Sequence, residues 1–317
     1  MGVQAEQLLG ELSDVWTALG KRQETSGGVL RACAMTLIAV VEQEAQPFDV
    51  EETLAELIHD HPSRAVVVRV AQGVQLSGRV FAQCWMPFGR RQQICCEQIE
   101  IHASPETIGN LPAVLRGLIA PDLPVVVWIR NPALLRQAAL ESVMELAHKV
   151  IIESRGFPEW RWLIWQIRRL SAQRPVVDLA WTRITRWRQL IAQIFEDHGR
   201  AALIPSLREI VIRHSLPESG PAAEYLGAWL ETSTGGRPSL RFEPAGDSRV
   251  WQIQQVWLAG PGLTISIRRT ERQVVEIEAN GLKTCNVFRV LKEADLLREE
   301  LSIPGEDPTF QRVLESL

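Results

Sequence analysis

The sequence predicts an α/β protein: a doubly wound, mainly parallel sheet with an added antiparallel hairpin, followed by a smaller α+β domain with an antiparallel meander. Two observations predict this fold class. In the first half, apolar segments typical of strands buried on both faces alternate with helical patterns. In the second half, three strands follow one another directly and keep one polar face. The chain has 317 residues, 46% of them hydrophobic, which is enough for two cores.

The first half begins with an amphipathic helix over 4–19, followed by a polar, glycine-rich break and a buried strand over 31–41. The elements that follow, in chain order, are a helix over 50–59, a strand over 63–70, extended segments over 73–84 and 92–103, a helix over 105–118, a strand over 123–129, a helix over 132–147 and a strand over 149–154. The two extended segments nearly alternate and are joined by a Pro/Gly turn at 86–90, so we expect them to form the hairpin. Strands that alternate with helices imply right-handed crossovers.

The pattern changes after about residue 170. We therefore predict a Rossmann-like domain over 1–170, which lacks a dinucleotide motif, and a C-terminal α+β domain over 171–317. The predicted elements near and beyond this boundary are helices over 158–170 and 182–197, a strand over 207–214, a helix over 222–232, strands over 250–258, 263–269 and 273–279, and helices over 292–301 and 308–317. The last two strands alternate apolar and polar residues, which indicates one solvated sheet face.

Composition excludes some classes of function. The formal net charge is −4 and the pI about 6.0, whereas a general nucleic-acid binder normally carries a marked basic excess. We expect no secretory signal and no membrane span, because the first 25 residues carry charges and the apolar runs are short. The five cysteines are an odd number at irregular spacing, so reduced thiols and a cytoplasmic location are expected.

Common catalytic signatures are missing from the sequence, which contains no GxGxxG, GxxxxGK[ST], HExxH or GxSxG motif. The first buried strand runs into EQEAQPFDVEE, which is acidic and has no glycine for close approach to a pyrophosphate. We therefore expect no dinucleotide and no other cofactor.

Two groups of residues are candidates for a metal site. His59, Asp60 and His61 lie at a helix-to-strand junction, where a capping or surface role is the better interpretation. Side chains of the predicted hairpin could also converge on an ion; these are Cys84, Cys95, Cys96 and His102. Adjacent Cys95 and Cys96 point to opposite faces of a strand, so core packing is favoured and no metal is predicted.

One region is unusually rich in arginine and tryptophan. Residues 155–188 contain eight Arg and five Trp but only two acidic residues, Glu159 and Asp178. On the helix over 158–170, one apolar stripe includes Trp160 and Leu163, and a second holds Trp162, Trp165 and Arg169. Such a helix should bury one side in its own domain and the other against something else. A domain junction, a protein-partner surface and a single-stranded nucleic-acid platform are the alternatives, and the net charge gives the last no support.

Several segments resemble one protein family. DLAWTRITRWR (178–188) is similar to the most distinctive motif of the glucose-6-phosphate dehydrogenase assembly proteins, OpcA. Other segments resemble the same family in chain order: VLRACAMTLIAVV (29–41), HPSRAVVV (61–68), CCEQIEIHA (95–103), PDLPVVVW (121–128) and KVIIES (149–154). The chain has Glu153 where the family tends to have Asp, which puts in doubt any role that needs the shorter carboxylate.

The resemblance implies a non-catalytic accessory protein that binds glucose-6-phosphate dehydrogenase and favours its active oligomer or conformation. The partner-binding candidates are Asp178, Trp181, Thr182, Arg183, Arg186, Arg188, Trp162, Trp165 and Arg169. Within the motif, Trp187 lies on the apolar helix face, so we expect it in the core. Arg183 and Arg186 lie off that face and can reach a partner or an anion, and Asp178 or Thr182 is expected to cap the helix.

Two other functions stay open. An enzyme or sensor for a sugar phosphate or another small anion would use the crevice at the carboxyl ends of the strands, with Arg64, Arg130 or Arg155 as phosphate partners. A structural subunit of some other complex is the third alternative.

Overall fold

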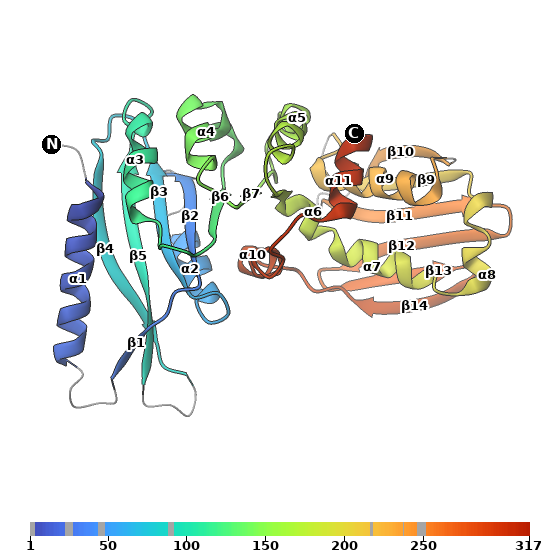
Figure 1. Cartoon of the computed structure of the whole chain (residues 1–317). Helices are drawn as coiled ribbons and strands as arrows, with labels where there is room; N and C mark the ends of the chain where they lie inside the picture. Colours follow the sequence, from blue (N-terminus) through green and yellow to red (C-terminus); the bar gives the residue numbers. More distant parts are fainter. Residues whose placement is uncertain are drawn as a thin grey trace. The chain divides into compact units, whose positions relative to one another are not determined.

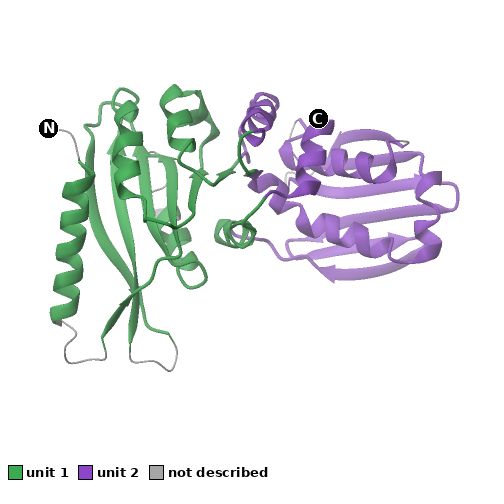
Figure 2. Cartoon of the chain, in the orientation of Figure 1, with its two compact units in different colours: residues 1–153, 173–176, 293–305 green, residues 154–172, 177–292, 306–317 purple. Residues whose placement is uncertain are grey.

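The computed structural model describes residues 4–22, 28–43, 48–87, 92–215, 218–236, 238–245 and 252–317 (Figure 1). Two compact units make up the chain (Figure 2). Unit 1 comprises residues 1–153, 173–176 and 293–305, and unit 2 comprises 154–172, 177–292 and 306–317. Three segments therefore group differently from the predicted division after residue 170: 154–170 belongs to unit 2, and 173–176 and 293–305 belong to unit 1. The division into two independently folding domains after residue 170 stays a prediction.

Unit 1 is built on the mainly parallel sheet that the sequence predicts. Its long central strands are β2 (Met35–Glu42), β3 (Ser63–Val70) and β5 (Gln93–Ala103), continued by β6 (Val125–Ile129) and β7 (Lys149–Ile152). The strand order is β1-β5-β3-β2-β6-β7-β8, where β1 is Val29–Arg31 and β8 is Val176–Asp178, of which only Val176 belongs to unit 1. All eight residues of β3 are buried, which explains why this strand has no polar alternation.

The predicted hairpin is confirmed as β4 (Ser77–Trp85) paired antiparallel with β5, whose other neighbours run parallel to it. Part of its predicted turn at 86–90 lies outside the described residues.

Unit 1 is completed by helices α1 (Ala5–Arg22), α2 (Phe48–Leu57), α3 (Leu111–Leu118), α4 (Ala138–Met144) and α10 (Glu293–Leu301), with 3-10 turns at Ile108–Asn110 and Pro132–Arg136. Helix α1 packs against β4 and α3 (Figure 1). A Cβ at Gly117 would lie 2.5 Å from the Ala5 Cβ, so glycine permits this approach.

Unit 2 contains a six-stranded mixed sheet in the order β10-β9-β11-β12-β13-β14. Its strands are β9 (Glu209–His214), β10 (Ser239–Pro244), β11 (Ile253–Gly260), β12 (Leu263–Glu271), β13 (Val274–Ala279) and β14 (Leu282–Val287). β11 to β13 form the predicted antiparallel meander, which β14 extends, and β9 and β10 pair in parallel. Strands β10 and β14 were not predicted.

The helices of unit 2 are α5 (Trp160–Ser171), α6 (Leu179–Arg183), α7 (Thr185–Ile194), α8 (His198–Ala201), α9 (Pro221–Thr234) and α11 (Pro308–Ser316), with a 3-10 turn at Ile204–Ser206. Helix α9 packs against β9, β10, α6 and α11 (Figure 1). Among the described residues of the whole chain, no helix is both long and apolar enough to cross a bilayer.

Several predicted elements are divided in the structure. The strand predicted over 31–41 is β1 and β2, separated by residues 32–34; β1 pairs with β5, whereas β2 pairs with β3 and β6. The helix predicted over 182–197 is α6 and α7, which meet at Ile184. There the backbone (φ −90°, ψ 1°) leaves the helical range, and the Ile184 N–H donates to the carbonyls of Trp181 and Thr182.

The expectation of reduced thiols is wrong for two cysteines. Cys84 of β4 and Cys95 of β5 form a disulfide. The register of the hairpin places these residues directly opposite each other, which the sequence alone does not specify. Cys33, Cys96 and Cys285 are free, with Cys96 buried and Cys285 exposed. Burial raises the pKa of the Cys96 thiol to about 11.

These environments predict the order of alkylation. Because the thiolate is the reactive form and Cys96 is both buried and poorly ionised, iodoacetamide at mildly alkaline pH should label Cys285 well before Cys96. Peptide mass spectrometry over time measures both rates, and Cys96 should become reactive only in denaturant. Equal labelling of the two thiols in the folded chain would contradict this burial.

Candidate functional site

The motif DLAWTRITRWR begins at the end of β8 and continues through α6 into α7. Asp178 is fully buried and caps α6, since its Oδ1 accepts a hydrogen bond from the Ala180 N–H at 2.9 Å. The same oxygen accepts from the Ser154 N–H at 3.3 Å, and Oδ2 accepts from the Tyr225 hydroxyl at 3.0 Å. One carboxylate therefore joins three separate segments of unit 2.

Trp181 is the second interior residue of the motif, with 1% of its surface exposed. Its indole N–H donates to Asp307 Oδ2 at 2.8 Å, and its ring packs 5.3 Å from that of Phe310. The Arg188 guanidinium lies 3.6 Å from the centre of the same ring, a cation–π contact. Asp178, Trp181 and the equally buried Thr182 were predicted as partner contacts. Their burial gives them a role in holding the helices of unit 2 together instead of a surface role.

Other predicted residues are exposed. On α5, Trp160, Leu163 and Ile167 are buried, as predicted for the first stripe. In the second stripe Trp162 is half-buried, with its ring centre 6.1 Å from that of Phe157, whereas Trp165 is 58% exposed.

The same helix and the motif also expose arginines. Arg169 of α5 is exposed, Arg186 is exposed, and Arg183 and Arg188 are half-buried. The Arg186 guanidinium donates to Gln189 within its own helix. Trp187 is buried in the core, as predicted, and the centre of its ring lies 5.1 Å from that of Phe288.

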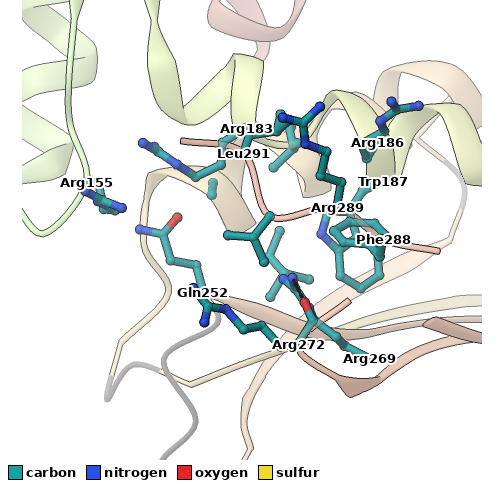
Figure 3. Close-up of a pocket in the computed structure, with 14 residues that line it drawn as sticks. Arg155, Arg183, Arg186, Trp187, Gln252, Arg269, Arg272, Phe288, Arg289 and Leu291 are labelled. Carbon is teal, nitrogen blue, oxygen red and sulfur yellow. Dashed lines mark hydrogen bonds between the residues drawn. The ribbon is translucent and has the colours of Figure 1, made fainter. Parts of the chain in front are cut away.

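An open pocket of about 630 Å³ lies within unit 2 beside this motif. Six arginines line it: Arg155, Arg183, Arg186, Arg269, Arg272 and Arg289. The other lining residues are Ile184, Trp187, Ala222, Gln252, Ile253, Phe288, Val290 and Leu291. Among the described residues that line the pocket, none is acidic. Figure 3 shows the labelled arginines spread around the opening, with Trp187 and Phe288 close together on one side.

Distant parts of the sequence form this pocket. Arg155 precedes α5, Arg183 and Arg186 belong to α6 and α7, and Arg269 and Arg272 lie at the end of β12 and in the turn after it. Arg289 follows β14. The sequence indicated the first three through their local density. It carried no signal for the other three, because only the fold of the meander brings them to the same place.

Arg269 is held in position by its neighbours. Its guanidinium lies 4.8 Å from the centre of the Phe288 ring, and its Nη2 donates to the Arg272 carbonyl at 2.7 Å. Burial lowers the pKa of Arg269 to about 10, because the charged form loses hydration. A negative charge nearby would stabilise this cation, so the site favours anions electrostatically.

The predicted anion-binding residues do not form one site. Arg64 is buried at the amino end of β3, opposite Thr36 of β2, and not at the carboxyl ends of the strands. Its Nε donates to Glu97 at 2.6 Å and its Nη1 to the Leu118 carbonyl at 2.7 Å, which favours a structural role. Arg130 follows β6 and forms an ion pair with Glu293, with 3.2 Å between Arg130 Nε and Glu293 Oε1. Of the three, only Arg155 lines the pocket.

Two family models match the chain in order. The first describes the N-terminal domain of a glucose-6-phosphate dehydrogenase subunit and matches residues 55–169. The second describes the C-terminal domain of the same kind of protein and matches residues 174–314. Both models carry the family name OpcA.

Curated relatives bear the same name. An OxPP cycle protein OpcA from Synechocystis is 24% identical over 225 residues, which are 69% of this chain and 44% of the relative. Another from Nostoc punctiforme is 21% identical over 256 residues, or 80% of this chain and 52% of the relative. The chain thus spans about half the length of the curated relatives it matches.

Solved structures with a partly similar arrangement include an oxidoreductase from Sinorhizobium meliloti and an NAD binding oxidoreductase from Klebsiella pneumoniae. The first has a TM-score of 0.48 and 11% identity, covering 89% of this chain and 86% of that one. The second has a TM-score of 0.41 and 12% identity, covering 90% and 96%. These scores are too low to carry an argument about activity.

Substitution of Asp178 should destabilise unit 2 strongly. Asp178→Ala leaves three donors without their acceptor, which costs about 3 kcal/mol or more in the free energy of unfolding. Tyr225→Phe removes only one of these hydrogen bonds and should cost about 1 kcal/mol. Chemical denaturation of both variants measures the two costs. A smaller cost for Asp178→Ala than for Tyr225→Phe would show that the carboxylate is not the centre of this network.

The only tyrosine of the chain offers a spectroscopic test of the same contact. Burial, the charge of Asp178 and their hydrogen bond raise the pKa of Tyr225 well above 10.0. Because the folded pKa exceeds the unfolded one, this group's contribution to stability is complete below pH 10.0 and is lost as the pH rises further. Tyrosinate absorbance should therefore appear only together with unfolding, as followed by circular dichroism. Ionisation in the folded chain near pH 10.0 would contradict the contact.

Proposed function

The chain belongs to the OpcA family, and from this premise we propose that it is a non-catalytic assembly factor that binds glucose-6-phosphate dehydrogenase and promotes its active oligomeric state. The observation that carries the proposal is the pair of consecutive family matches, since both are described as domains of a subunit of this dehydrogenase. The absence of common catalytic motifs from the sequence supports a role other than turnover.

The proposed mechanism is a shift of population. An accessory protein activates an enzyme without chemistry of its own if it binds the active state more tightly than the inactive one. A tenfold shift needs about 1.4 kcal/mol of differential binding. A few well-placed contacts provide this amount.

The proposed contact lies on α5 and the α6–α7 segment. Trp165 is 58% exposed on a helix whose opposite side is buried, and Arg169 is exposed one turn further on. Arg183 and Arg186 extend from the same unit. Tryptophan and arginine are the residues most enriched in binding hot spots, because both combine a large contact area with directed polar groups. The remaining candidates, Trp162 and Arg188, are half-buried.

The alternative of a sugar-phosphate enzyme is less well supported, since Arg64 and Arg130 are engaged with Glu97 and Glu293 in unit 1. The cellular role in the oxidative pentose phosphate pathway and a cytoplasmic location follow from the proposed partner.

Activity and mass should change together when the two proteins are mixed. The purified chain should raise the rate of the dehydrogenase of the same organism and increase its light-scattering mass. Arg183→Ala/Arg186→Ala should raise the concentration of the chain that is needed for activation at least about tenfold, because two contacts to the partner are lost. Thermal melting should show that the variant stays folded.

The matched control removes two exposed arginines from the sheet of the same unit, Arg213→Ala/Arg268→Ala. It makes the same change in net charge and should activate as the unchanged chain does. If the Arg183/Arg186 variant activates normally, the contact lies elsewhere. If the unchanged chain neither binds nor activates the enzyme, the proposed function is wrong.

The hydrophobic part of the contact can be isolated at Trp165. Trp165→Ala should weaken binding to the dehydrogenase by about 2 kcal/mol or more if this side chain is a hot spot, with little effect on folding. Leu282→Ala truncates another exposed apolar residue, 70% exposed on β14, and serves as the control. Titration calorimetry measures both, and equal affinities for the two variants would remove Trp165 from the interface.

A further inference from the structure

We propose that the arginine-lined pocket of unit 2 binds an organic polyphosphate, meaning a molecule with two or more phosphate groups joined to an aromatic or apolar group. The proposal goes beyond the assembly function and does not depend on it, because every residue that carries it belongs to unit 2 and it concerns the chain alone.

The lining of the pocket is strongly positive. Six of the fourteen lining residues are arginines, and among the lining residues that the structure describes none is a carboxylate. Each guanidinium carries five N–H donors in a planar fork, so one arginine can bind a protein acceptor and still bind a phosphate. A single phosphate cannot contact arginines on all sides of a pocket of this size, so the arrangement fits a ligand with several anionic groups.

On the meander side of the pocket, the Arg269 guanidinium and the backbone at Arg272 and Arg289 are held in position before any ligand binds. Arg269 is fixed by the Phe288 ring at 4.8 Å and by its hydrogen bond to the Arg272 carbonyl. That bond also holds the turn that carries the Arg272 side chain. Arg289 directly follows Phe288 in the chain, so the ring that contacts Arg269 also anchors the backbone at Arg289. A cluster arranged in advance loses less conformational entropy on binding.

The remainder of the lining is not what inorganic phosphate requires. The ring centres of Trp187 and Phe288 lie 5.1 Å apart (Figure 3), and Val290 and Leu291 also line the pocket. Gln252 also lines the pocket, and within the described part of the chain its buried Oε1 has no hydrogen-bond donor. An unsatisfied acceptor among arginines suits a ligand that brings a hydroxyl or amino donor. A ring system with polar substituents meets both requirements.

The size of the pocket also suits an organic ligand. Its volume of about 630 Å³ is within the range of about 300–1,000 Å³ that is usual for sites of small organic ligands. Nucleoside di- and triphosphates combine several phosphates, a sugar with hydroxyl donors and an aromatic base, and they represent this class of ligand.

The test measures binding to the purified chain by titration calorimetry at constant ionic strength. The probes are ATP, sodium tripolyphosphate and adenosine. ATP should bind more tightly than tripolyphosphate, which lacks the ring, and much more tightly than adenosine, which lacks the charge. Arg272→Gln/Arg289→Gln should weaken ATP binding by roughly 100-fold, as expected for two lost charge-assisted hydrogen bonds. Both side chains are exposed, so the fold should tolerate their replacement.

The matched control is Arg213→Gln/Arg268→Gln, which removes the same charge from exposed arginines that do not line this pocket. It should bind ATP as the unchanged chain does. Gln252→Leu removes the acceptor and should weaken ATP binding while it leaves tripolyphosphate binding unchanged.

Three results would overturn the proposal. No ATP binding to the folded chain would exclude the site. Equal weakening in both arginine double variants would show a diffuse charge effect instead of a pocket. Adenosine or tripolyphosphate that binds as tightly as ATP would show that charge and ring are not recognised together. Because the dehydrogenase is absent from all these measurements, they do not depend on whether the assembly function is correct.

Discussion

The Asp178 carboxylate is the interaction on which unit 2 depends most. It lies at the point where β8 ends and α6 begins, and it accepts hydrogen bonds from the backbone before α5, from the first turn of α6 and from Tyr225 of α9. A buried carboxylate is stable only when its acceptors are occupied. The three buried donors likewise require the Asp178 carboxylate as their acceptor. Together these hydrogen bonds fix the relative positions of α5, α6 and α9.

That arrangement divides the distinctive motif into an inner and an outer part. Asp178, Trp181 and Thr182 are buried, and Trp181 extends the network to Asp307 at the start of α11. Arg183 lies just before the helix break at Ile184 and Arg186 just after it, and both line the pocket. The motif thus combines buried residues that pack the helices of unit 2 with arginines that line the pocket.

Much of the fold could be predicted from local pattern. β3 was predicted with its observed bounds because of its valine-rich run over 65–68, and the antiparallel meander was predicted because β12 and β13 alternate. β14 was missed because all six of its residues are exposed, so it has no buried face to produce a pattern. The Cys84–Cys95 disulfide was missed because it depends on strand register, which is a tertiary property.

The candidate site was predictable only where its residues are close in sequence. Arg155, Arg183 and Arg186 belong to a dense stretch of arginine and tryptophan, and that density pointed to them. Arg269, Arg272 and Arg289 lie in strands and turns with ordinary composition, and the sheet alone brings them to the pocket. Burial also had to come from the structure, since Trp165 and Trp181 are equally apolar in sequence but are 58% and 1% exposed.

The proposed function depends on α5 and the α6–α7 segment forming the surface that meets the dehydrogenase. Hydrogen–deuterium exchange of the chain, alone and with glucose-6-phosphate dehydrogenase, tests this surface without a substitution, because it reports on backbone amides along the whole chain. We predict slower exchange over residues 160–171 and 183–188 in the complex. A complex that forms with unchanged exchange in both segments, and with protection elsewhere, would contradict it.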